Sequence, residues 1–95
     1  MQVVGGAAGT AYAGWLTHAN LPGYAMFLRP FSIKSGWTAA PQQISREYGD
    51  PSVWPGDTFG ITALTPFELV LSWGSATPSV GNKKSDIFAV HVTVQ

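Results

Sequence analysis

Apolar and polar residues alternate most regularly in the last third of the chain. Between residues 67 and 73 every second side chain is large and apolar, namely Phe67, Leu69, Leu71 and Trp73. The C-terminal segment repeats this pattern with Phe88, Val90, Val92 and Val94, and the positions between them hold Ile87, Ala89, His91 and Thr93. A period of two places alternate side chains on opposite faces of a strand, and β-branched residues suit a pleated surface. The pattern therefore predicts two strands, each with one face toward a core.

The first half of the chain predicts strands less clearly. Residues 10–19 (TAYAGWLTHA) and 23–33 (GYAMFLRPFSI) are short aromatic and aliphatic runs, and the adjoining NLPG and KSG sequences are typical of turns. Pro30 lies inside the second run, so we expect this strand to bend or to lie at the edge of a sheet. Residues 41–50 (PQQISREYGD) fit either a short helical turn or a strand.

Glycine and proline are spread along the whole chain, with 11 Gly and 7 Pro, which disfavours any long helix. The sequence contains no heptad pattern, no repeat and no separate linker. We therefore predict one all-β domain over residues 1–95, a small β-sandwich or barrel of about six short, mainly antiparallel strands.

Residues 48–57 (YGDPSVWPGD) contain two Gly, two Pro and two Asp in ten positions, residues that favour turns. The prolines restrict the backbone and the glycines permit positive φ, which predicts a stiff double turn. Trp54 lies between two prolines of this turn. A rigid aromatic on a loop either plugs the open end of a small sandwich or forms a contact surface, and both interpretations stay open here. Tyr48 and Asp50 belong to the same candidate surface.

The N-terminal residues 1–10 (MQVVGGAAGT) combine an apolar tip with flexible glycines. Each ordered residue costs about 1–2 kcal/mol of backbone entropy, so we expect this segment not to order itself. Val3 and Val4 suit pairing with the edge of a strand. The segment is therefore predicted to be an arm that docks on a neighbouring subunit. The alternative is that it forms the first strand of its own sheet.

Charged residues make up only 11% of the 95-residue chain, against about 25% in an average domain, whereas 45% of the residues are apolar. The first 28 residues contain no Asp, Glu, Lys or Arg. A small domain has much surface to cover, so this composition indicates an exterior that solubilises a free monomer poorly. The composition thus favours association with other subunits.

The sequence lacks the features that nucleic-acid binding and membrane insertion usually require. The formal net charge is zero, and nucleic-acid binding usually needs clustered cations to neutralise phosphates. The uncharged N-terminal run lacks the basic region of a secretory signal, and its glycines interrupt it too often for a membrane helix. We therefore expect no nucleic-acid partner and no membrane span.

Catalytic and metal-binding signatures are also weak. The chain has no Cys, and His18 and His91 lie far apart without the spacing of metal ligands. Neither G-x-S-x-G nor a phosphate-binding glycine motif occurs. Glu47 and Asp50 adjoin Arg46, so we expect ion pairing there. In residues 81–86 (GNKKSD) two lysines oppose calcium binding. We expect no enzyme, no cofactor and no metal.

Aromatic residues are the main resource for recognition, with four Trp and three Tyr. Trp15 and Trp73 fall in predicted strands, where we expect them to fill the core. Trp37 and Trp54 fall in loops. Sugar rings stack on exposed Trp, and nearby loop polar groups are available for sugar hydroxyls (Gln42, Gln43, Asp50 and Asn82). The same aromatic residues could instead anchor a protein–protein interface, where Trp and Tyr are enriched and charge is depleted.

The lack of charge favours the interface, because one sugar site would not require a long uncharged N-terminal stretch. We predict a non-enzymatic structural subunit that self-associates or joins other subunits, such as a virion component or a surface filament, with an extracellular or virion-associated location. The alternative is a lectin-like, carbohydrate-binding module. The candidate binding or interface residues are Trp37, Trp54, Tyr48, Asp50, Val3 and Val4.

Overall fold

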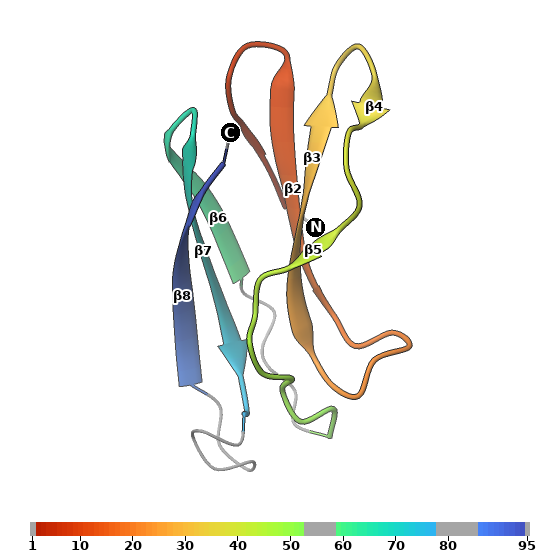
Figure 1. Ribbon diagram of the computed structural model, residues 1–95. Helices are drawn as coiled ribbons and strands as arrows, with labels where there is room; N and C mark the ends of the chain where they lie inside the picture. The colour runs from red at the N-terminus through yellow and green to blue at the C-terminus, as the bar shows by residue number, and fades with distance from the viewer. Residues whose placement is uncertain (1, 53–58, 78–85, 95) are drawn as a thin grey trace.

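The chain is an all-β protein in the computed structural model, which describes residues 2–52, 59–77 and 86–94 (Figure 1). Two antiparallel sheets pack face to face, so of the predicted β-sandwich or barrel the structure is a small β-sandwich. The first sheet contains β1 (Gln2–Gly5), β2 (Thr10–Thr17), β3 (Ala25–Ser32), β4 (Gly36–Trp37) and β5 (Gln42–Gln43). The second contains β6 (Phe59–Thr65), β7 (Glu68–Ser75) and β8 (Asp86–Thr93). No helix occurs in these described ranges.

The core lies between the two sheets. The first sheet contributes Tyr12, Met26 and Leu28, and the second contributes Ile61, Leu69, Leu71 and Trp73. The alternation along β7 is the reason that its leucines and its tryptophan all point inward. On β8 the inward positions are Phe88, Val90 and Val92, which pack against this core but stay only partly buried. The predicted inward face is confirmed for the residues within both strands, whereas Phe67 lies in the turn before β7 and is 53% exposed.

The N-terminal segment forms the first strand of its own sheet rather than an arm that reaches a neighbour. β1 pairs with β2 in antiparallel register, so that Val4 lies beside Tyr12 and packs against the core. Gln2 also ties β1 to the second sheet: its Nε2 donates to the Phe59 carbonyl oxygen at 2.7 Å, and its Oε1 accepts from the Ile61 N–H at 3.3 Å. These contacts connect β1 to both sheets, although glycines follow it in the sequence.

Residues 48–52 connect the two sheets. Gly49 exchanges backbone hydrogen bonds with Tyr24 at the start of β3, and the Asp50 N–H donates to the Ala76 carbonyl oxygen just beyond β7. The Asp50 carboxylate accepts from the N–H and the hydroxyl of Ser52, which forms a tight turn stabilised by an aspartate side chain. The described part of this stretch therefore links the two sheets through backbone hydrogen bonds. Trp54 lies outside the described residues.

Trp15 faces away from the core, whereas the sequence predicted that it faces inward. Trp73 is in the core, 5% exposed, as expected. Trp15 is not, because Tyr12, Gly14 and Leu16 occupy the inward positions of β2 and the odd-numbered positions face outward. The prediction of Trp15 as a core residue is wrong for a physical reason: both faces of β2 are apolar, so its alternation does not identify the inner face.

Candidate functional site

The outer face of the first sheet carries a group of aromatic residues, which we call the aromatic face. The register of β1 to β4 places on it Val3, Ala11, Ala13, Trp15, Phe27, Arg29, Phe31 and Trp37. Trp15 stacks on Phe27, with ring centroids 5.8 Å apart and an interplanar angle of 16°. Phe31 meets Trp37 edge to face, with centroids 5.5 Å apart and an angle of 81°. These separations fall in the range where aromatic pairs attract each other beyond simple burial.

Arg29 is the one charged residue of the aromatic face. Its guanidinium carbon lies 4.5 Å from the centroid of the Trp37 ring, and its Nε donates to the Ala39 carbonyl oxygen at 2.8 Å. Within the part of the chain that the structure describes, no carboxylate forms an ion pair with it. A planar guanidinium is weakly hydrated and stacks on aromatic rings, so it is compatible with burial against a partner.

Much of the aromatic face is open to solvent. Val3 is 64% exposed, Trp37 is 44% exposed and Phe31 is 37% exposed, whereas Trp15 and Phe27 are half-buried. None of the described strands packs on this side of the sheet. Apolar area left in water forgoes about 25 cal/mol per Å² of stabilisation, so a contiguous face of this kind is typical of a surface that meets a partner.

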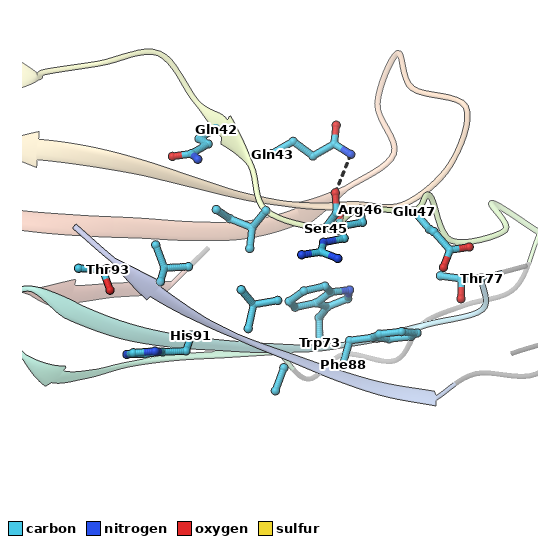
Figure 2. Close-up of a pocket in the computed structure, with 14 residues that line it drawn as sticks. Gln42, Gln43, Ser45, Arg46, Glu47, Trp73, Thr77, Phe88, His91 and Thr93 are labelled. Atoms are coloured by element: carbon cyan, nitrogen blue, oxygen red, sulfur yellow. Dashed lines mark hydrogen bonds between the residues drawn. The ribbon is translucent and has the colours of Figure 1, made fainter. Parts of the chain in front are cut away.

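A second feature is a cleft at the open side of the sandwich, which we call the edge cleft. It has a volume of about 670 Å³ and lies between residues 42–47 and the strands β7 and β8. Figure 2 shows Trp73 of β7 and Phe88 of β8 on one side of the cleft, and Arg46 pointing into it from the segment on the other side. Arg46 forms no ion pair with an acid among the described residues, so the pairing expected there is not seen. Gln43 donates to the Ser45 carbonyl oxygen at 3.0 Å on the rim.

The structure distributes the predicted site residues among different places. Val3 and Trp37 lie together on the aromatic face. Val4 contacts the core, and Asp50 forms the turn that joins the sheets. Tyr48 is 36% exposed, and its hydroxyl donates to the Gln43 Oε1 at 3.2 Å near the edge cleft. The described candidates therefore lie in separate places: on the aromatic face, against the core, at the connection between the sheets and near the edge cleft.

Sequence reasoning missed most of the aromatic face, namely Trp15, Phe27, Arg29 and Phe31. The signal was present in residues 26–31, where two alternating sets of apolar residues occupy both faces of the strand. An antiparallel sheet with one face in water normally shows polar residues at every second position. The lack of such polar positions was the sign that the outer face of this strand is apolar as well as the inner face.

The two histidines occupy exposed positions. His91 lies 3.1 Å from a Glu68 carboxylate oxygen on the outer face of the second sheet, and His18 packs against the edge of Tyr24 with centroids 4.6 Å apart. In residues 2–52, 59–77 and 86–94 there is no group of three or more His, Asp or Glu side chains suited to a metal ion. Nor does this part of the chain contain a helix long and apolar enough to cross a membrane. No protein-family model, curated protein or solved structure matches the chain.

Proposed function

We propose that this protein is a non-enzymatic structural subunit that self-associates into a larger assembly, of the kind found in virions or surface filaments. The observation that carries the proposal is the aromatic face. It joins two aromatic pairs, an exposed valine and one arginine on a single sheet surface with no described strand over it.

The composition of this face matches what the centre of a protein interface contains. Trp, Phe and Arg are enriched in interface cores, whereas Lys, Glu and Asp are depleted there. Arg29 is already held by Trp37 and Ala39, so less side-chain entropy is lost when a partner covers it. A stable interface buries about 1,200–2,000 Å² in total, which a whole sheet face can supply more readily than a single loop.

A charge placed on the aromatic face tests the proposal. Val3→Lys puts a cation on this face at a position 64% exposed, and the matched control is Leu64→Lys at a position 60% exposed beside the β6–β7 turn. We expect Val3→Lys to lower the average mass measured by light scattering at unchanged thermal stability, with an apparent dissociation constant raised about tenfold or more, equivalent to about 1.4 kcal/mol. Equal effects of the two substitutions would contradict a role for this face.

A carbohydrate-binding module is the second candidate, because Trp37 stays 44% exposed although Arg29 covers part of its ring. An exposed indole can stack on a sugar ring, and Gln42 and Gln43 lie on the neighbouring edge strand β5. Trp37→Ala separates the two candidates. Loss of binding on a glycan array at unchanged mass supports the carbohydrate module, whereas a lower mass without any glycan signal supports the interface.

A further inference from the structure

Among the described residues, the strand β8 has one edge that no other strand pairs with. It pairs with β7 along its whole length, from Asp86 opposite Ser75 to Thr93 opposite Glu68, and with no other described strand. Its sequence, DIFAVHVT, contains no Pro, Gly or Lys and has its single acidic residue at the first position. Natural proteins usually protect an exposed edge with prolines, lysines or bulges. The β7–β8 register shows no bulge either, so β8 has none of these protections.

The backbone groups on this edge can be assigned from the register. The Val94 N–H donates to the Phe67 carbonyl oxygen at 2.8 Å, so Val94 points its backbone groups toward β7. In an antiparallel ladder the direction alternates from one residue to the next, so Ile87, Ala89, His91 and Thr93 point theirs away from β7. Consistent with this, the Ile87 N–H is accepted at 2.8 Å by the carboxylate of Asp86 rather than by a backbone carbonyl.

We infer that β8 pairs antiparallel with β8 of a second copy of this chain, in a register centred on Val90. This register places Ala89 opposite His91 of the partner subunit and Ile87 opposite Thr93 of the partner subunit. Every residue that points its backbone groups away from β7 then meets a residue that does the same, so donors and acceptors match around a two-fold axis. The inference rests on the proposed self-association and names one interface for it.

Side chains and charges favour the same register. Phe88, Val90 and Val92 are only half-buried beside the edge cleft. In the paired form Phe88 adjoins Val92 of the partner subunit and the two copies of Val90 adjoin each other, which continues the apolar inner face from one subunit to the next. The acidic Asp86 lies at the end of the strand, so the two copies of Asp86 lie at opposite ends of the ladder and no like charges face each other.

A single introduced cysteine tests the register directly, because the chain has no Cys of its own. In Val90→Cys the two thiols meet on the two-fold axis, where opposite Cα atoms of a non-hydrogen-bonded pair are about 4.5 Å apart, within the range of a disulfide. In the control Ile87→Cys the two thiols are separated by six strand positions, or about 20 Å. Under mild oxidation we expect a covalent dimer from Val90→Cys and none from Ile87→Cys. No dimer from Val90→Cys, or equal dimer from both, overturns the inference.

A proline at an outward-pointing position provides a second measurement. Ala89→Pro removes an N–H that does not belong to the β7 ladder, and Ala89→Ser keeps this N–H with a similarly small side chain. We expect Ala89→Pro, but not Ala89→Ser, to raise the apparent dissociation constant at least tenfold at retained circular dichroism. If the unmodified chain assembles and Ala89→Pro assembles equally well, the β8 pairing is wrong while self-association stands. If the unmodified chain is a monomer at every concentration, the proposed function falls together with it.

Discussion

Tyr24 and Gly49 exchange two backbone hydrogen bonds, each 2.8 Å long, across the junction between the start of β3 and the segment that leads to the second sheet. This pairing leaves no room for extra atoms around it. A methyl group on the preceding residue, Gly23, would overlap the Gly49 carbonyl oxygen, and one on Gly49 would overlap the buried hydroxyl of Ser75. The glycines of this junction are therefore fixed by close packing of backbone.

Gly23→Ala is expected to destabilise the fold, because the carbonyl it would strike belongs to the backbone and cannot rotate away. Overpacking of this kind costs about 1–3 kcal/mol, which urea unfolding measures as a lower midpoint at unchanged slope. Gly5→Ala is the control, since a methyl there has no atom within 4 Å. A Gly23→Ala protein as stable as Gly5→Ala would show that the junction is looser than described.

Leu71→Ala is expected to lower the free energy of unfolding by about 2–5 kcal/mol, because Leu71 is fully buried between the sheets and its removal leaves a cavity. The same change at Leu64, which is 60% exposed, removes little packing and should cost about 0.5 kcal/mol or less. Chemical unfolding of both variants provides the comparison. Similar losses at the two positions would mean that the core is not where these contacts place it.

The fold was predictable where one face of a strand differs from the other. In β7 and β8 the alternation identified the inward residues, because the positions between them are mostly polar or small. In β2 and β3 both faces are apolar, so the pattern did not decide which face holds Trp15. β1 pairs with β2 and also contacts the second sheet through Gln2 and Phe59, a contact between residues far apart in sequence that local pattern does not encode.

The candidate site was predictable only in part, for the same reason. Val3 and Trp37 were identified by their residue type and flexible surroundings, but their common face depends on the register of four neighbouring strands. Turn chemistry predicted a turn that the structure shows at residues 50–52, but Gly49 forms a bridge with Tyr24 and is not in the left-handed region that the turn prediction allowed for. Turn chemistry could not show that Gly49 pairs with Tyr24 beside β3 while Asp50 bonds Ala76 beyond β7, since that requires knowing which strands lie adjacent.

Deletion of residues 1–5 is expected to destabilise the subunit itself. It removes Val4 from the core contacts and both hydrogen bonds between Gln2 and β6. Burial of one valine alone contributes about 1.5 kcal/mol or more, so the melting temperature should fall clearly. Circular dichroism during heating measures this. If the shortened chain melts like the full chain but no longer assembles, residues 1–5 act between subunits and this prediction is wrong.

Arg29→Met is expected to destabilise the aromatic face, because it keeps the apolar stem but removes the cation over Trp37 and the hydrogen bond to the Ala39 carbonyl oxygen. The two interactions together contribute about 1–3 kcal/mol at a partly buried site. Urea unfolding monitored by tryptophan fluorescence reports the change. Lys34→Met is a suitable control because Lys34 is exposed in the β3–β4 turn. If the two variants unfold alike, the arginine contributes nothing to this face.

Self-association is tested most directly by the mass of the unmodified chain in solution, measured by light scattering over a series of micromolar concentrations. The aromatic face and the free edge of β8 predict a mass above the 10.1 kDa of one chain, and a mass that rises with concentration. A single species of 10.1 kDa at every concentration would contradict the proposed function.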